Sequence, residues 1–146
     1  DGGASNDTLF GQAGADVLIG GKGKDVMTGG ADADVFVFAI GDTAATNGFV
    51  DTITDFNAAA DSIDIDVFSG PFSASAYGEL TVGTNSFDDA LLAARGAMTP
   101  SISAIFVAGT TDGWLFWDSN GDHVPDQAVI LQGANSLGAF DQHHII

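Results

Sequence analysis

Residues 2–37 read GGASNDTLF, GQAGADVLI, GGKGKDVMT and GGADADVFV, four consecutive segments of nine residues. Each follows the pattern G-G-x-G-x-D-x-U-x, in which U is a large apolar residue. The sixth position holds aspartate every time, at Asp7, Asp16, Asp25 and Asp34. Four consecutive matches in register indicate a true repeat, and not a chance gathering of turn residues.

Each segment is expected to form a turn followed by a very short strand. Glycines in the first six residues can take positive φ and leave backbone carbonyls uncovered. The last three residues favour β structure, and the middle one points to a single face. Two segments make one coil, so residues 18 apart should stack at about 4.8 Å. The core-facing row predicted in this way is Leu9, Leu18, Met27 and Phe36.

Stacking places Asp7 against Asp25, and Asp16 against Asp34. Two carboxylates about 5 Å apart repel by roughly 3 kcal/mol at an effective dielectric constant near 20. A Ca²⁺ ion between them reverses the sign of that interaction, because it takes 6–8 oxygen ligands and both carboxylates and turn carbonyls can supply them. We therefore predict calcium sites, and a coil that is unstable without calcium.

Three positions depart from the pattern. Ser5 and Asp32 stand at fourth positions where glycine is expected, and Gln12 stands at a second position. Ser5 belongs to the first aspartate pair, and Gln12 and Asp32 to the second. Two interpretations stay open: either pair is weakened by these residues, or Asp32 adds a ligand.

Composition limits the classes of function. The chain has 146 residues, with 20 acidic residues against 3 basic ones and a net charge of -17. Such a charge argues against nucleic acid as a partner. An apolar content of 45% argues against a disordered acidic tail. Without cysteine there is no disulfide framework, and bound calcium can stabilise a small fold in place of disulfides. No apolar run is long enough to span a membrane.

The sequence starts within the repeat array at Asp1, without Met or a recognisable signal peptide. We expect it to be the C-terminal part of a longer protein whose working domain lies upstream.

Beyond the repeats, the apolar run Val35–Ile40 is expected to be the last strand of the coil. One helix is predicted over 86–96, with Ser86 as N-cap and Gly96 as its stop. Strand-like patterns bounded by turn residues follow the repeats; they cover 50–56, 61–68, 80–82, 101–108, 114–117 and 127–131.

The predicted fold class is mainly β, in one structural domain. Residues 1–38 form an N-terminal parallel β-roll. Residues 39–146 form an antiparallel β capping region with one short helix, which closes an open end of the roll.

With these elements in view, the chain resembles the C-terminal domain of RTX proteins exported by type I secretion, and is similar to the serralysin-type β-roll domain. The family includes proteases, lipases, adhesins, S-layer proteins and the R-modules of alginate epimerases. The segments that carry the resemblance beyond the first three repeats are 29–38, 53–56 and 61–65.

The resemblance implies that the four repeat aspartates donate side-chain oxygens to calcium. It also implies further ligand positions in the turns, which are Gly2, Gly11, Gly20, Gly29, Ser5, Gly14, Gly23 and Asp32. Asp51 or Asp55 could close a terminal site, or be ordinary strand residues facing solvent.

The resemblance further implies an uncleaved export signal at the C-terminus, with the type I secretion apparatus as partner and a secreted or cell-surface location in bacteria. Residues 138–146 are compatible with such a signal, although on the residues alone they could also form an ordinary edge strand.

A second acidic stretch spaces oxygens like half of an EF-hand loop, at Asp118, Asn120, Asp122 and Asp126. However, His123 stands where that loop needs glycine, and no glutamate follows at its twelfth position. A hairpin that turns at Asn120-Gly121 is therefore the favoured interpretation.

No catalytic motif is evident. His123, His143 and His144 lack the H-E-x-x-H pattern of a zinc protease, and neither G-x-S-x-G nor a P-loop occurs. We predict a non-catalytic, calcium-binding domain that folds on meeting extracellular calcium. The alternative is a module that binds polysaccharide or a cell surface through Trp114 and Trp117, although these residues are better explained as core.

Overall fold

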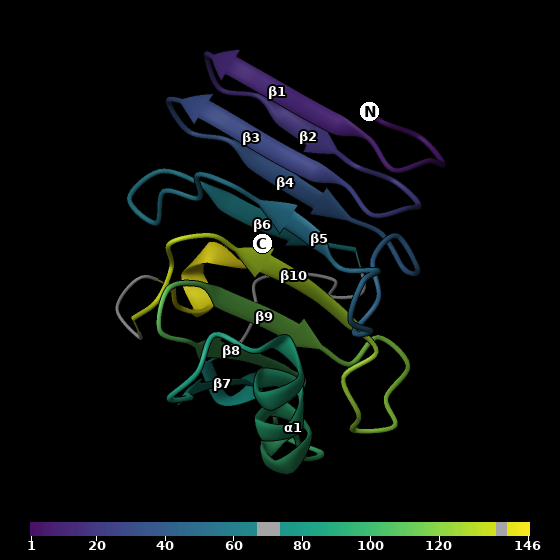
Figure 1. Cartoon of the computed structure of the whole chain (residues 1–146), viewed down its shortest axis with the longest axis vertical. Helices are drawn as coiled ribbons and strands as arrows, with labels where there is room; N and C mark the ends of the chain where they lie inside the picture. Colours follow the sequence, from purple (N-terminus) through teal and green to yellow (C-terminus); the bar gives the residue numbers. More distant parts are fainter. Residues whose placement is uncertain (67–73, 137–139) are drawn as a thin grey trace.

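The structure is a computed structural model, and it describes residues 1–66, 74–136 and 140–146. Its strands form two sheets, one of seven strands in the order β1-β3-β5-β10-β9-β8-β7 and one of three in the order β2-β4-β6. In Figure 1 the roll runs from purple through blue to blue-teal at the top, and the capping region, from teal through green to yellow, lies below it.

The first half is a parallel β-roll, as predicted. Its strands are β1 (Thr8–Ala13), β2 (Val17–Ile19), β3 (Val26–Ala31) and β4 (Val35–Phe38). Leu9 pairs with Met27 across β1 and β3, and Leu18 pairs with Phe36 across β2 and β4. Both pairs are 18 residues apart, and Leu18, Met27 and Phe36 are buried while Leu9 packs against them.

The roll has a third coil that the nine-residue period does not reveal. β5 (Asp51–Ile53) pairs parallel with β3, and β6 (Ser62–Ile65) pairs parallel with β4. The expectation that Val35–Ile40 is the last coil strand is therefore wrong. The longer loop between β4 and β5 lengthens this coil, so it falls outside the repeat. The domain division after residue 38 stays a prediction, and strand pairing crosses it.

The capping region contains β7 (Tyr77–Thr81), β8 (Ala104–Ala108), β9 (Gly113–Trp117) and β10 (Gln127–Leu131). β9 runs antiparallel to both β8 and β10. β7 runs parallel to β8, because α1 lies between them in the chain and parallel strands need such a crossover. The region is thus mixed and not wholly antiparallel. β10 joins it to the roll by pairing parallel with β5.

Helix α1 spans Phe87–Ala97. Its start is as predicted, since the Ser86 hydroxyl accepts the backbone N–H of Asp89 at 3.4 Å. Its end is not, because the helix continues through Gly96 to Ala97. Met98 is its C-cap, and the N–H of Met98 donates to the Ala94 carbonyl. The buried Met98 side chain explains the difference, since packing holds the last turn against the sheet.

The large sheet is covered on both faces in its capping half. One face packs between the sheets, through residues such as Phe106, Leu115 and Trp117. The opposite face packs under α1, through Ile105, Trp114 and Phe116. Burial on both faces explains why β8 and β9 are apolar throughout and do not alternate.

The C-terminal residues dock on the core. Phe140 is fully buried, and the Tyr77 hydroxyl donates to its carbonyl at 3.3 Å. After the short 3-10 helix η3 (Gln142–His144), the Ile146 N–H donates to the Ile63 carbonyl at 3.0 Å, beside β6. Residues 138 and 139 of the predicted export signal, and 67 and 68 of a predicted strand, lie outside the described residues.

In the described ranges, no helix has the length and apolar character needed to cross a membrane.

Candidate metal centre

Aspartates of the first and third repeats form a hydrogen-bonded ladder along one edge of the roll. The backbone N–H of Asp7 donates to Oδ1 of Asp25 at 2.8 Å. One coil further, the N–H of Asp25 donates to Oδ1 of Asp51 at 2.7 Å. The structure therefore stacks Asp7 with Asp25, as the 18-residue spacing predicted, and adds Asp51 to the stack.

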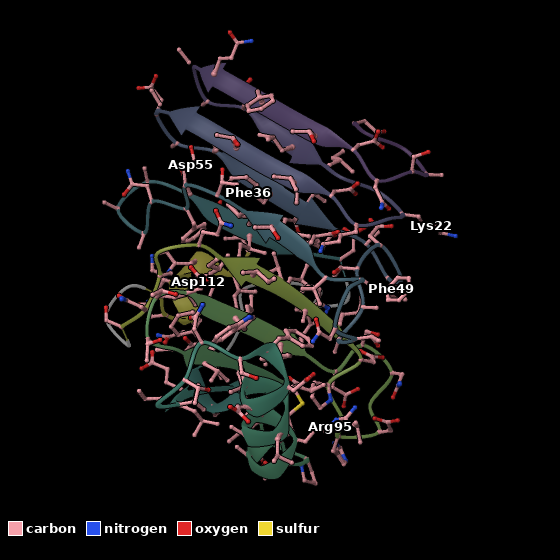
Figure 2. The ribbon with its side chains drawn as sticks, in the orientation of Figure 1. Lys22, Phe36, Phe49, Asp55, Arg95 and Asp112 are labelled. Atoms are coloured by element: carbon pink, nitrogen blue, oxygen red, sulfur yellow. The ribbon has the colours of Figure 1, made fainter. Side chains whose placement is uncertain are left out.

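The second and fourth repeats form an equivalent ladder along the other edge. The N–H of Asp16 donates to Oδ1 of Asp34, and the N–H of Asp34 donates to Oδ1 of Asp61, both at 3.0 Å. Figure 2 shows the two edges, with Lys22 at the first and Asp55 at the second, on opposite sides of the roll. Asp61 was missed in the sequence because it lies 27 residues from Asp34, off the nine-residue period.

The second carboxylate oxygen of these ladders is buried without a hydrogen-bond partner among the described residues. The oxygens concerned are Oδ2 of Asp7, Asp16, Asp25, Asp34 and Asp51. Burying an unpaired carboxylate costs several kcal/mol, so such oxygens are normally matched by a donor or a cation. Two rows of them on stacked turns are therefore a donor set suited to a hard cation.

The electrostatics of the ladders agree with this interpretation. Burial, with added repulsion from neighbouring aspartates, raises the pKa of Asp25 and of Asp34. Burial, followed by the charges of Asp25 and Asp42, raises the pKa of Asp51 to about 7. A cation beside these groups would favour their ionised forms, which is the reverse of what burial alone does.

The first glycine of each repeat makes room for the carboxylate. A β-carbon on Gly2 or Gly11 would meet Oδ2 of the same repeat's aspartate at 3.0 and 2.9 Å. The same carbon on Gly20 would meet Oδ2 of Asp25 at 2.5 Å, and one on Gly29 would collide with Oδ2 of Asp34. Only glycine at this position lets the oxygen lie against the turn.

The other turn positions set the stacking distance. Gly23 (φ 144°) leaves no room for a β-carbon, which would strike the Ser5 carbonyl one coil away. Gly14 (φ 111°) donates its N–H to Oδ2 of Asp32 at 3.3 Å.

Two of the residues that depart from the repeat pattern have a strained backbone. Gln12 and Asp32 lie in the left-handed region, at φ 79° and 81°, where L side chains are strained.

No three acidic or histidine side chains converge on one point within the described residues. A site between two stacked aspartates supplies two carboxylates, so backbone carbonyls must complete the shell. Calcium accepts such mixed ligands readily. The arrangement thus fits two-carboxylate sites and excludes a three-carboxylate cage in that part of the chain.

A family model of the RTX calcium-binding nonapeptide repeat matches residues 1–36, in four copies. This segment consists of RTX calcium-binding repeats. Repeats of this family bind calcium, so calcium is the cofactor that this segment indicates.

Two solved structures share the fold of the chain. The AlgE6R3 subunit of the Azotobacter vinelandii mannuronan C5-epimerase has a TM-score of 0.60 and 23% identity, and the match covers 100% of this chain and 80% of that one. The AlgE6R2 subunit of the same enzyme has a TM-score of 0.60 and 26% identity, with 99% and 78% covered. Comparison with curated proteins gives no match.

Beyond the RTX repeats, Asp55 and Asp61 have both carboxylate oxygens bonded by protein. Asp55 accepts the N–H groups of Gly29 and Gly30, each at 2.9 Å. Asp61 accepts the N–H of Asn57 at 2.8 Å with its second oxygen. Of the two residues predicted to close a terminal site, Asp51 has an oxygen without a hydrogen-bond partner in the described part of the chain, and Asp55 does not.

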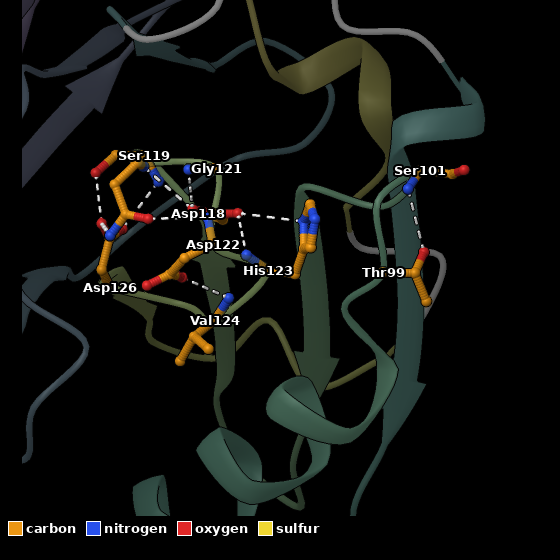
Figure 3. Close-up of polar contacts among 10 residues, drawn as sticks. Thr99, Ser101, Asp118, Ser119, Gly121, Asp122, His123, Val124 and Asp126 are labelled. Atoms are coloured by element: carbon orange, nitrogen blue, oxygen red, sulfur yellow. Dashed lines mark hydrogen bonds and ion pairs between the residues drawn. The ribbon is translucent and has the colours of Figure 1, made fainter.

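The second acidic stretch forms a hairpin loop between the antiparallel strands β9 and β10 (Figure 3). The buried Asp118 carboxylate accepts backbone N–H groups from Asn120, Gly121 and His123 at 3.1, 2.7 and 2.8 Å. Burial alone would raise its pKa, but these donors outweigh burial and hold the pKa below its usual range.

The remaining carboxylates of the loop are bonded in the same way. Asp126 accepts the N–H and the hydroxyl of Ser119, and Asp122 accepts the N–H of Val124. The hairpin interpretation is confirmed, and the loop is held by its own backbone donors.

Trp114 and Trp117 are 2% and 0% exposed. They fill the two cores and form no surface on which a sugar ring could stack, so the structure does not support the polysaccharide-binding alternative through these residues.

Proposed function

We propose that this chain is a non-catalytic, calcium-dependent folding domain of an exported protein. The observation that carries the proposal is the pair of aspartate ladders, in which five second oxygens are buried without a hydrogen-bond partner among the described residues. They are Oδ2 of Asp7, Asp16, Asp25, Asp34 and Asp51. The proposed ligands are the carboxylates of Asp7, Asp16, Asp25 and Asp34, with carbonyls from the glycine-rich turns.

The proposal assigns opposite states to low and high calcium. At low calcium, the buried carboxylates and the net charge of -17 oppose compaction. When calcium occupies the sites, each one with a Kd tenfold below the free concentration adds about 1.4 kcal/mol of stability. Several such sites together are comparable with the whole stability of a small domain, about 5–15 kcal/mol.

We also propose that the C-terminal residues act as an export signal read by a type I secretion apparatus, which would give the protein an extracellular or cell-surface location. The resemblance to exported RTX proteins supports this role. The fold adds an order of events, because Phe140 and Ile145 are buried once the domain has folded. An apparatus that reads this segment must therefore meet it before folding.

Circular dichroism of the chain in calcium and in excess chelator tests the folding proposal. We expect a large gain of β structure when calcium is added. A chain that is equally folded in chelator would overturn the proposal.

A matched pair of variants locates the effect. Asp16→Asn should shift the titration to higher calcium, because it removes a ladder carboxylate. Asp66→Asn removes the same charge from an exposed position and should leave the titration unchanged.

A further inference from the structure

The sequence contains two Asn-Gly steps, Asn47-Gly48 and Asn120-Gly121. Both are exposed, the first in the loop between β4 and β5 and the second in the hairpin loop between β9 and β10. Both glycines have a positive φ, 91° for Gly48 and 82° for Gly121. The two steps therefore share their covalent chemistry and a similar glycine conformation, and they differ in their hydrogen bonds.

An Asn-Gly step favours deamidation, because glycine has no side chain to obstruct the reaction. The glycine nitrogen attacks the asparagine Cγ, a new N–Cγ bond closes a five-membered succinimide ring, and the Cγ–Nδ2 bond breaks. Ammonia leaves with the proton that the glycine nitrogen has lost. Water then opens the ring at either carbonyl and produces aspartate or isoaspartate. The reaction needs a glycine N–H that can lose its proton and an asparagine side chain that is free to reach the nitrogen.

At Asn47-Gly48 neither reacting group is held. The two residues are the centre of a turn that is closed by the N–H of Phe49, which donates to the Thr46 carbonyl at 3.0 Å. A positive φ at Gly48 and not at Asn47 is the pattern of a type II turn, whose closing bond uses neither central N–H. Within residues 1–66, 74–136 and 140–146, neither the Gly48 N–H nor the Asn47 side chain has a hydrogen bond.

At Asn120-Gly121 the fold holds both groups. The Gly121 N–H donates to Oδ1 of the buried Asp118 at 2.7 Å (Figure 3). The Asn120 side chain is bonded at both ends, since its Nδ2 donates to Oδ2 of Asp126 at 3.0 Å and its Oδ1 accepts the N–H of Asp122 at 2.9 Å. The Asp118 carboxylate also opposes loss of the Gly121 proton, because it would place a second negative charge beside the first.

We propose that Asn47 is a site of spontaneous deamidation in the folded protein, and that the hydrogen bonds of the hairpin loop protect Asn120 from the same reaction. The reactant is the chain itself, and the co-reactant is water. The product carries one more negative charge in the loop between β4 and β5, and isoaspartate also lengthens the backbone there by one carbon atom. The site lies outside both aspartate ladders.

Incubation of the folded chain in mildly alkaline buffer with saturating calcium, followed by peptide mapping, tests the proposal. Tryptic cleavage at Arg95 separates the two sites, because Asn47 precedes this residue and Asn120 follows it. Asn47 should react at least about tenfold faster than Asn120, since reaction at Asn120 must first break a strong hydrogen bond to a carboxylate. Equal rates at the two sites, or an unmodified Asn47, would overturn the proposal.

The same incubation in concentrated urea removes the fold and should bring the two rates together. An Asn120 that reacts much more slowly than Asn47 in urea as well would show that its protection does not come from the folded loop, which overturns that part of the proposal.

Two variants assign the effect to particular groups. Asn47→Gln should abolish most of the charge change that ion-exchange chromatography detects in the folded chain, because glutamine must close a six-membered ring, which forms far more slowly. An undiminished charge change would overturn the site at Asn47. Asp118→Ala frees the Gly121 N–H and should raise the rate at Asn120 towards that at Asn47. If this variant folds and Asn120 stays intact, the protecting role is overturned; if it does not fold, the comparison in urea tests that role.

Discussion

Oδ2 of Asp25 lies 2.5 Å from the point that a β-carbon on Gly20 would occupy. The turn and the carboxylate therefore depend on each other. Gly20→Ala should push the carboxylate out of its buried position and weaken calcium binding about tenfold or more, since a loss of 1.4 kcal/mol is a factor of ten. Isothermal titration calorimetry measures this directly.

The control for Gly20→Ala is Gly96→Ala in α1, where a β-carbon would meet nothing within 4 Å. It should leave calcium affinity unchanged and stabilise the helix by about 1 kcal/mol. Equal calcium affinities for the two variants would contradict the role assigned to Gly20.

Gln12 occupies a second position of the repeat with φ 79°, where the other three repeats have glycine. Gln12→Gly relieves that strain and should raise stability by about 1 kcal/mol, net of the added freedom of the unfolded chain. Thermal unfolding in saturating calcium is the measurement. Ala13→Gly, at the next residue, should instead destabilise, and a lower melting temperature for Gln12→Gly would refute the strain argument.

The raised pKa of Asp51 predicts how the stability of the calcium-free fold changes with pH. Burial and the charges of Asp25 and Asp42 raise this pKa to about 7 in the fold, against about 3.9 in an unfolded chain. Between these values the fold retains a proton that the unfolded chain has lost. The stability of the calcium-free fold should therefore fall as pH rises from about 4 to about 7, and then level off.

Urea unfolding in excess chelator at about pH 4, 6 and 8 measures this stability. Asp51→Asn should flatten the decline, because it removes the titrating group. A wild-type stability that does not fall between about pH 4 and about pH 7 would contradict the assignment.

Phe140 anchors the C-terminal residues. Its ring centroid lies 5.3 Å from that of Phe106 and 5.5 Å from that of Phe56, and its side chain is fully buried. Phe140→Ala should lower the free energy of unfolding by about 3–5 kcal/mol. The number of calcium ions bound at saturation should not change, because Phe140 belongs to the hydrophobic core and to neither ladder.

Urea unfolding in saturating calcium checks the effect of Phe140→Ala. Ile146→Ala is the control, since its side chain is 50% exposed and its backbone bond to Ile63 is retained. It should cost less than about 1 kcal/mol. Similar losses for both variants would show that Phe140 is no anchor.

The features predicted well from the sequence are those with a fixed local period. A coil of two nonapeptides places Leu18 over Phe36, so the spacing alone predicted both the row and its direction. The start of α1 at Ser86 and the strand β10 were also predicted, because capping chemistry and turn residues mark them locally.

The features that were missed depend on contacts between distant segments. Asp61 joins the second ladder 27 residues after Asp34, off the nine-residue period, because a longer loop precedes it. Asp51, 26 residues after Asp25, was predicted only as one of two alternatives with Asp55, since nothing in the local sequence distinguishes it from other aspartates of half-buried strands. The burial of Phe140 likewise arises from its packing on Phe56 and Phe106, far away in the chain.

Strand β5 belongs to both halves of the molecule. It pairs with β3 of the last repeat coil on one side and with β10 on the other, and Asp51 itself lies opposite Val129. The ordered roll therefore offers a template edge on which the rest of the seven-stranded sheet can assemble. The capping region contains no nonapeptide, yet its folding would then also depend on calcium. Protease resistance should therefore be gained or lost by both halves together.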